Sequence, residues 1–416
     1  MIPPVNGKSV EANYKWRILT LAALTHTLVV AMPSMCMPVL FPEIAADLGL
    51  DLVQIGAVWG LGSLTGIFTG LVGGSLGDRY GTKRVLTIAC LLAGMAGALR
   101  GLAADFGTLS ATVLLYGLLT PAIPMNVHKV CGLWFSGRRL GLANGVVSAG
   151  MALGFVAGSM ISATLLSPWL GGWRQVLFLY GAIAMGMSLP WAMTRPAPGE
   201  SRPSAGDTGP ASIRQALARV ARVRNIWLLG LAIMGLGGCI QGLLGYLPIY
   251  LRETGWSTAS ADGALAAFHS ISLVSAIPIT LLSDKLGTRK AILVTAALLT
   301  ATGTGLLSLV SGPMVWVSVI TAGIFRDGFM ATFMASIIEL EGIGATYAGT
   351  AIGSVMIFSG LGGLILPPLG NSLAVTDLRS PFVFWAAMAV MALLGFYLVE
   401  EKRNIGEVRR EHSRAG

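Results

Sequence analysis

The chain has 416 residues, of which 54% are hydrophobic and only 11% are charged, and its mean hydropathy is +0.74. Soluble globular proteins carry about 25% charged residues, so this composition excludes an ordinary soluble domain and predicts a polytopic membrane protein. The net charge of +9 is typical of basic loops beside a lipid bilayer, and we expect no nucleic acid partner. The four cysteines show no metal-ligand or disulfide spacing, so neither a metal nor a cofactor is expected.

Twelve apolar runs follow one another along the chain, and each is close to the roughly 20 residues that a spanning helix needs. They cover residues 17–41, 53–76, 85–102, 108–133, 140–165, 172–193, 225–250, 261–283, 290–309, 313–338, 346–370 and 380–399. We therefore predict an all-α membrane protein with twelve transmembrane helices. They form two six-helix bundles, at residues 1–193 and 225–400, followed by a tail at 401–416.

The stretch between the two groups, residues 194–224, is rich in proline, glycine and serine and then becomes basic with helical spacing. This composition predicts a linker that ends in an amphipathic helix lying along the membrane surface. Lysine and arginine concentrate in alternate loops, in the linker and at both ends of the chain. Because cytoplasmic loops carry the positive excess, we expect both termini and the linker to be cytoplasmic, in a multi-pass protein of the cell membrane.

An internal repeat links the two groups. The sequence GSLGDRYGTKR at residues 74–84 follows the second run, and LSDKLGTRK at residues 282–290 follows the eighth. At an offset of 206 residues, Asp78 matches Asp284, Gly81 matches Gly287, and Lys83-Arg84 match Arg289-Lys290. Matching loops at the same place in two six-helix halves indicate a parallel repeat.

The first loop resembles the signature of the major facilitator superfamily, and the twelve runs and the second loop extend this resemblance over the whole chain. The resemblance implies two bundles around a central cavity, which open alternately to the two sides of the membrane. It also implies that the loop residues form a cytoplasmic gate. The gate residues transferred in this way are Asp78, Arg79, Gly81, Lys83 and Arg84, with Asp284 and Arg289 in the second copy.

The resemblance further implies that the first, fourth, seventh and tenth helices face the cavity. Their polar residues give the substrate-binding candidates Tyr116, Asn126, Lys129 and Gln241, and the proton-coupling candidate His26. Two alternatives stay open. His26 either hydrogen-bonds a neighbouring helix or carries a proton. Lys129 either extends to the inner membrane surface or helps to hold an anion.

Arg326 and Asp327 lie in the middle of the tenth run, near the membrane midplane. A charge there costs about 2.5–3.5 kcal/mol on insertion scales, so the pair needs a function. Successive residues on a helix diverge by about 100°, so we expect the two side chains to point in different directions. Arg326 then holds an anionic group and Asp327 is its counter-ion or a proton carrier; the alternative is a purely structural pair. Arg100, by contrast, is expected to be a loop or gate charge at the outer end of the third helix.

Drug/proton antiporters of the superfamily carry a Gly-Pro pair in the fifth helix and an arginine in the fourth, and this chain has neither. Residues 133–145 are instead similar to the cyanate/nitroimidazole permease and small organic-anion porter branches. We therefore predict a monomeric secondary transporter for a small organic anion, coupled to protons. The alternatives are an efflux antiporter for amphipathic compounds and a membrane sensor that does not transport. An enzyme is not expected, because no constellation of nucleophile and base is visible.

Overall fold

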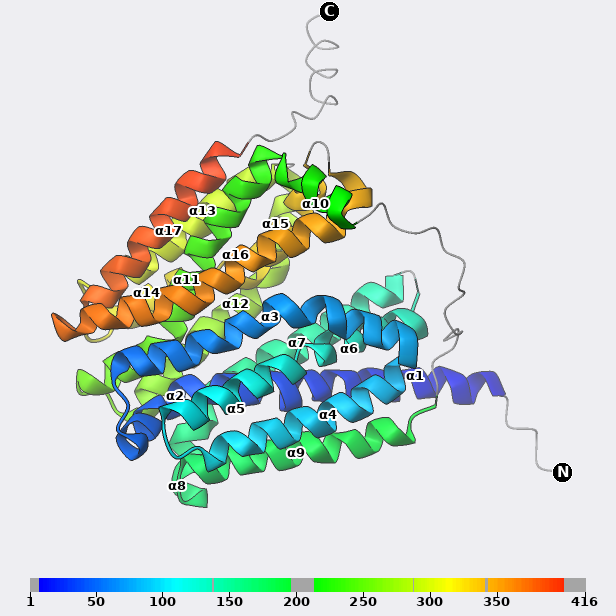
Figure 1. The fold of residues 1–416 in the computed structure, drawn as a ribbon, viewed down its shortest axis with the longest axis horizontal. Coiled ribbons are helices and arrows are strands. Elements are labelled where there is room, and N and C mark those ends of the chain that lie inside the picture. The colour runs from blue at the N-terminus through cyan, green and yellow to red at the C-terminus, as the bar shows by residue number, and fades with distance from the viewer. Residues whose placement is uncertain (1–6, 137, 196–212, 287, 341–342, 400–416) are drawn as a thin grey trace, which may run out of the picture.

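The computed structural model describes residues 7–136, 138–195, 213–286, 288–340 and 343–399. Within these ranges it describes all side chains except those of residues 7–13, 64–75, 78, 138, 213–216, 280, 283–284, 331 and 344–348. The described ranges contain helices and no strand, and the helices form two halves that lie one above the other (Figure 1). The all-α prediction is therefore confirmed for the described part of the chain.

The first half runs from α1 to α9. Its elements are α1 (Gly7–Thr25), η1 (His26–Ala31), α2 (Met32–Leu48), α3 (Leu52–Tyr80), α4 (Thr82–Leu99), η2 (Arg100–Leu102), α5 (Phe106–Leu119), α6 (Ala122–Trp134), α7 (Arg138–Ile161), η3 (Ser162–Leu166), α8 (Ser167–Leu170) and α9 (Trp173–Met193). The π-helical turn η1 joins α1 and α2 into one long helix, because the residues that flank it, Thr25 and Met32, both keep helical backbone angles.

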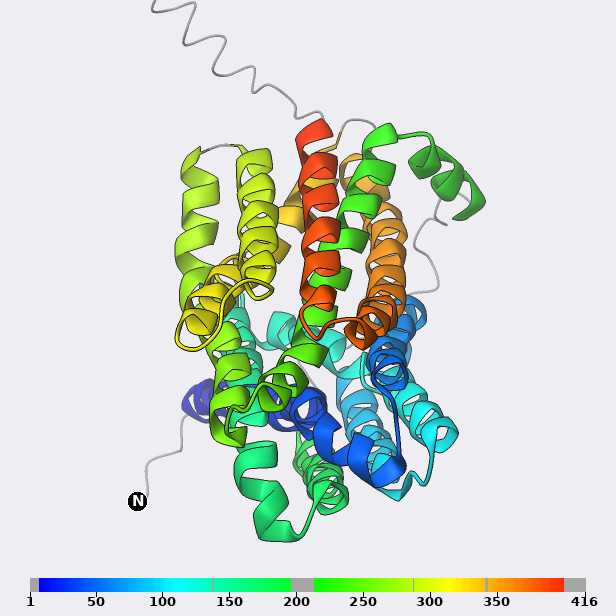
Figure 2. The same cartoon turned by 90° about the vertical axis from the view of Figure 1, so that its left-hand side faces the viewer.

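The second half runs from α11 to α17, after a short amphipathic helix. Its elements are α10 (Ile213–Ala221), α11 (Arg224–Glu253), α12 (Thr258–Leu286), α13 (Arg289–Leu306), α14 (Met314–Gly323), α15 (Arg326–Ile338), α16 (Gly344–Ser372), η4 (Leu373–Val375) and α17 (Ser380–Leu398). The short helix α10 occupies the end of the predicted linker, and Figure 2 shows it beside the end of the second half, away from the first.

Ten helical segments in the described part of the chain are long and apolar enough to cross a membrane. The two remaining predicted runs coincide with α3 and α13. The apolar part of α3 among residues with described side chains is the shorter stretch Leu52–Ser63, and α13 has only 18 residues and begins with two basic ones. All twelve runs therefore coincide with helices, and ten of these helices meet the length and hydropathy expected of a membrane span.

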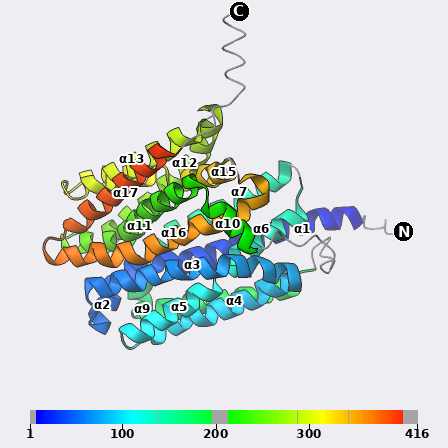
Figure 3. The ribbon, with the colours of Figure 1, turned by 45° about the horizontal axis from the view of Figure 1, so that its top comes forward.

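The two halves meet along α3 and α16, which lie side by side in Figures 1 and 3. Glycines make this approach close: a Cβ added at Gly60 would lie 2.7 Å from the carbonyl oxygen of Leu364, and one at Gly56 would lie 2.8 Å from the Cα of Pro368. Toward the other end, where α10 and α15 lie, the halves diverge in Figure 1. The halves therefore meet at the end where α3 begins, opposite the repeat loops.

Candidate substrate-binding site

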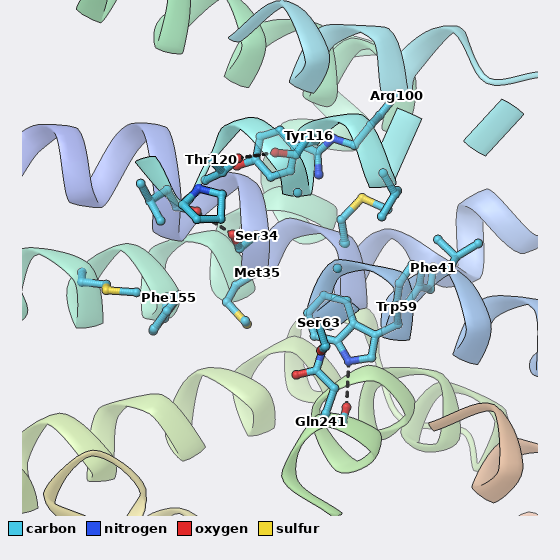
Figure 4. A pocket seen from close by; sticks show the side chains of 18 residues that line it. Ser34, Met35, Phe41, Trp59, Ser63, Arg100, Tyr116, Thr120, Phe155 and Gln241 are labelled. Atoms are coloured by element: carbon cyan, nitrogen blue, oxygen red, sulfur yellow. Dashed lines mark hydrogen bonds between the residues drawn. The ribbon is translucent and has the colours of Figure 1, made fainter. Parts of the chain in front are cut away.

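The fourth predicted span is broken in the middle. The helix α5 ends at Leu119 and α6 begins at Ala122, with Thr120 and Pro121 between them, as expected for a proline that removes a backbone donor. The Thr120 hydroxyl donates to the carbonyl oxygen of Tyr116 at 2.7 Å. Both side chains line a cavity of about 310 Å³ that opens at this break (Figure 4).

The cavity has mainly apolar and aromatic walls and a few polar groups. Its apolar lining includes Val30, Met35, Met37, Phe41, Val58, Trp59, Val113, Met151 and Phe155, and its polar lining consists of Ser34, Ser63, Arg100, Tyr116, Thr120 and Gln241. Figure 4 shows Arg100, Tyr116 and Thr120 on one side, and Trp59, Ser63 and Gln241 on the opposite side. All lining residues except Gln241 belong to the first half.

Arg100 is the charged residue of this cavity. Its side chain is only 2% exposed, and its guanidinium carbon lies 4.0 Å from the centre of the Tyr116 ring. Its Nε donates to the carbonyl oxygen of Gly97 and its Nη1 to that of Pro33, both at 3.3 Å, whereas its Nη2 is buried without a hydrogen-bond partner. Among the described residues, no carboxylate pairs with it.

The expectation that Arg100 is a loop or gate charge is therefore wrong. The reason is local: α4 ends at Leu99, and Arg100 opens the 3-10 turn η2, where its side chain lies over Tyr116 instead of extending outward. A tyrosine face attracts a guanidinium, and two carbonyl groups fix its plane. A signal was present in the sequence, since this arginine directly follows an apolar run.

Two of the predicted substrate-binding residues line the cavity. The Tyr116 hydroxyl donates to the carbonyl oxygen of Val29 at 3.2 Å, so its ring is held as a platform for Arg100. The backbone carbonyl of Gln241, on α11, accepts from the indole nitrogen of Trp59 at 2.7 Å, which leaves the Gln241 carboxamide at the cavity wall. The bond between Trp59 and Gln241 also joins the two halves.

The other predicted residues of the first half are not among those that line this cavity. Asn126 is fully buried, donates to the carbonyl oxygen of Ala122 at 2.8 Å and lies against Gly77 of α3. His26 begins η1 and is also buried, with its ring 5.3 Å from that of His128 in an edge-on arrangement. Lys129 is half-buried on α6. Their proposed roles in binding and proton transfer stay predictions.

Arg326 and Asp327 form an ion pair, with Nη1 and Oδ1 2.9 Å apart. The expectation that their side chains point in different directions is wrong, because the tenth span is interrupted. The helix α14 ends at Gly323 and α15 begins at Arg326, so the pair occupies a helix start. The Arg326 guanidinium also lies 5.2 Å from the ring centre of Phe155, which lines the cavity. Arg326 is thus beside the cavity, with its charge neutralised.

The first repeat loop connects α3 to α4 at Gly81. This residue has φ 84°, a left-handed value that favours glycine. Arg79 is exposed and stacks on Tyr80 at 5.4 Å, Arg84 is exposed, and Lys83 is half-buried. The side chain of Asp78 lies outside the described residues. The predicted gate function of this loop stays a prediction.

In the second repeat loop, Arg289 pairs with Glu339 at 3.4 Å, and both residues belong to the second half. The side chain of Asp284 lies outside the described residues. The Arg289–Glu339 pair shows that the basic residue of this copy contacts the end of the tenth span. A bond between the halves at this loop stays a prediction.

Two further contacts join the halves at the end opposite the repeat loops. Asp262 of α12 is fully buried; it accepts from Arg252 at 2.5 Å and from Thr164 of the first half at 2.8 Å. Asn371 of α16 donates to the carbonyl oxygen of Leu52 at 2.7 Å. These two bonds hold the halves together at this end.

A helical fold with ten candidate membrane spans in the described ranges, and a cavity that residues of both halves line, is typical of polytopic membrane transport proteins. The family model of the Major Facilitator Superfamily matches residues 22–341 and 263–415. The chain therefore belongs to the Major Facilitator Superfamily, which confirms the resemblance inferred from the repeat loops and indicates a transporter rather than an enzyme.

Several relatives carry names of organic-anion transporters. The chain is 28% identical to the 3-(3-hydroxy-phenyl)propionate transporter of Escherichia coli (strain K12), over 84% of this chain and 87% of the relative. It is 26% identical to the gallate transporter of Pseudomonas putida, over 92% of each. It is 24% identical to the 4-hydroxybenzoate transporter of Pseudomonas aeruginosa, over 82% of this chain and 78% of the relative.

Solved structures agree on the fold. The nucleoside transporter NupG superposes with a TM-score of 0.79 at 13% identity, over 91% of this chain and 99% of that one. A bacterial homologue of the human lysosomal transporter Spinster, in an inward-facing conformation, superposes with a TM-score of 0.74 at 16% identity, over 92% of this chain and 96% of that one.

Proposed function

We propose that the protein is a secondary transporter that moves a small aromatic carboxylate across the cell membrane, coupled to protons. The observation that supports this most is Arg100, a buried guanidinium in the cavity with one nitrogen unpartnered and no carboxylate partner among the described residues. A buried cation without a counter-ion is costly, and a carboxylate from the substrate offsets that cost with charge-assisted hydrogen bonds.

The cavity walls favour an aromatic anion over an inorganic one. Trp59, Phe41 and Phe155 present ring surfaces, and Met35 adds an adaptable thioether. The volume of about 310 Å³ is at the small end of the usual range for ligand pockets, which suits a single substituted ring. The names of the relatives, which include hydroxyphenylpropionate, hydroxybenzoate and gallate transporters, point to the same class of substrate.

Alternating access is the proposed mechanism. The bond of Thr164 to Asp262 and that of Asn371 to Leu52 close one end, while the halves diverge at the other end, where the repeat loops lie (Figure 1). With twelve spans and cytoplasmic termini, as the loop charges predict, the closed end is the outer one. The structure then corresponds to a state that opens toward the cytoplasm, and the monomer contains the complete path.

Proton coupling is proposed at Asp327 or His26. Asp327 is a carboxylate whose charge is balanced by Arg326 at 2.9 Å, and its side chain is 34% exposed, so a proton can reach it. His26 is the alternative, because it is a buried imidazole on the first helix, which the family resemblance places at the cavity. Arg326 contacts Phe155, which lines the cavity, through a cation–π interaction. It is proposed as a second positive charge that attracts the anion once Asp327 is protonated.

Uptake into proteoliposomes tests the proposal. Labelled benzoate, 4-hydroxybenzoate and 3-phenylpropionate are compared with the uncharged amide of each acid, with and without a pH gradient. We expect saturable uptake of the acids, stimulated by a gradient that is acidic outside, and none of the amides. Flux of a cationic dye but of no acid would refute the anion assignment in favour of an efflux antiporter. Saturable binding of an acid without any flux would instead indicate a sensor.

A further inference from the structure

We infer that Gln241 and Ser63 form a hydrogen-bonding subsite for a hydroxyl group on the substrate ring, at the side of the cavity opposite Arg100. The inference rests on the proposed function, because it takes the carboxylate of the substrate to be held at Arg100. It adds a second recognition element, which would select hydroxylated aromatic acids over their unsubstituted parents.

The polar side chains that line the cavity differ in whether they already make hydrogen bonds within the protein. The hydroxyls of Ser34 and Thr120 are engaged with carbonyl groups of their own helices, at 2.6 Å and 2.7 Å. The Ser63 hydroxyl and the Gln241 carboxamide make no hydrogen bond with any other side chain or backbone group in the described ranges, and both line the cavity. Groups that can form hydrogen bonds with a ligand therefore remain at two places, at Arg100 on one side of the cavity and at Ser63 with Gln241 on the other (Figure 4).

Ser63 and Gln241 both pack against Gly363 of α16, which has no side chain to occupy this space. A Cβ added at Gly363 of α16 would lie 2.4 Å from the Ser63 hydroxyl oxygen and 3.8 Å from Cγ of Gln241. The bond from the Trp59 indole to the Gln241 carbonyl fixes the backbone of α11 at this point. The carboxamide thus extends from a fixed position next to the Ser63 hydroxyl, as Figure 4 shows.

Their chemistry matches a phenolic hydroxyl. A phenol donates one hydrogen bond and accepts others, and a carboxamide together with a hydroxyl offers donors and acceptors side by side. A carboxylate at this place would meet no cation among the described lining residues, whereas Arg100 provides one on the opposite side. The substrate is therefore oriented with its carboxylate toward Arg100 and its ring hydroxyl toward Ser63 and Gln241, with the ring between the apolar walls.

The subsite also spans the two halves, since Ser63 belongs to α3 and Gln241 to α11. A hydroxyl held by both would keep them together at the end of the cavity that is already closed. An acid without the hydroxyl leaves both groups without a ligand partner, so we expect it to bind more weakly.

The test compares two acids that differ by one hydroxyl, 4-hydroxybenzoate and benzoate, by calorimetric titration of the purified full-length protein. We expect the unmodified protein to bind 4-hydroxybenzoate roughly 3- to 10-fold more tightly, the effect of one to two neutral hydrogen bonds. Gln241→Leu and, independently, Ser63→Ala should bring this ratio close to one, mainly by weakening binding of 4-hydroxybenzoate. The matched control Ser188→Ala, a buried residue of the first half that does not line the cavity and whose hydroxyl donates to the carbonyl oxygen of Met185, should keep the ratio.

The outcomes separate this subsite from the proposed function. Equal affinity of the unmodified protein for both acids, or an unchanged ratio in both Gln241→Leu and Ser63→Ala, overturns the subsite and leaves anion transport standing. Failure of the unmodified protein to bind either acid overturns both. Thermal unfolding of each variant shows whether it is folded, and Ser63→Ala, which only removes an oxygen, provides the test if Gln241→Leu does not fold.

Discussion

Replacing Arg100 by glutamine should weaken anion binding without unfolding the protein. Glutamine keeps a donor that can reach one of the two backbone carbonyls that Arg100 serves, but it loses the charge and the free Nη2. A hydrogen bond to a charged group is worth about 1.5–3 kcal/mol. At about 1.4 kcal/mol per factor of ten, the dissociation constant of an aromatic carboxylate should rise roughly 10- to 150-fold.

The effect on the free protein should be small by comparison. The arginine loses its stacking on Tyr116 when it is replaced, but the variant no longer buries a cation without a counter-ion, which is itself costly. The increase in unfolding free energy on ligand binding is therefore the quantity that best reports the loss of affinity. A ligand at about 100 times its dissociation constant stabilises the protein by about 2.7 kcal/mol, and a 100-fold weaker affinity reduces this to about 0.4 kcal/mol at the same concentration.

Thermal unfolding with and without 4-hydroxybenzoate, supported by calorimetric titration, measures this change. Arg174→Gln is the matched control, since Arg174 lies in the same half, pairs with Asp47 at 2.9 Å and does not line the cavity. Arg100→Lys should be intermediate, because lysine keeps the charge but loses the planar fork. The reasoning is refuted if Arg100→Gln binds the acid normally while Arg326→Gln abolishes binding, because the anion would then be held on the second half.

Three further predictions concern the remaining charges. Arg326→Gln should lower the melting temperature more than the double variant Arg326→Gln/Asp327→Asn, because the single change leaves Asp327 without its partner; equal melting temperatures would contradict the pairing. Asp262→Asn should weaken the bonds that join the halves opposite the repeat loops, the end proposed to be the outer one, so that Ser34→Cys in this background reacts faster with an impermeant thiol reagent from outside; Asp47→Asn, whose partner is in its own half, should leave this rate unchanged. Asp78→Asn should slow transport with little change in substrate affinity, and an unchanged turnover would argue against a gate at this loop.

The boundaries of the helices were largely predictable from the sequence because lipid imposes a strict requirement. Every backbone polar group in the bilayer must be satisfied within a helix, so apolar length translates directly into helical spans. The predicted run 225–250 corresponds to Arg224–Glu253, and 380–399 to Ser380–Leu398. A proline accounts for the break at Thr120 and Pro121. No feature of the sequence predicts the π-helical turn η1, since such turns depend on packing.

The candidate site was less predictable, since a charge in an apolar run indicates a function but not the direction of the side chain. The depth of Arg326 in an apolar run predicts a binding role, yet its neighbour Asp327 neutralises it, because the span is interrupted between Gly323 and Arg326. Arg100 stood at the end of a run, where a charge is ordinary, and only the three-dimensional fold shows that it turns inward onto Tyr116. Tyr116 and Gln241 line the cavity and lie on the fourth and seventh spans, which the family resemblance predicts to face it; their role in binding stays a prediction.

The division of the polar groups between the halves bears on how binding could drive transport. A ligand shifts a conformational equilibrium only if it interacts differently with the two states. An acid that touched Arg100 alone would bind the first half equally well whether the halves were together or apart. A substrate that also reaches Gln241 binds best when α11 lies close to α3, as the bond from Trp59 to Gln241 now holds it. The cation would then supply affinity, while the distal hydrogen bonds would favour the state with its outer end closed, so a hydroxylated acid should be transported faster than its unsubstituted parent at equal occupancy.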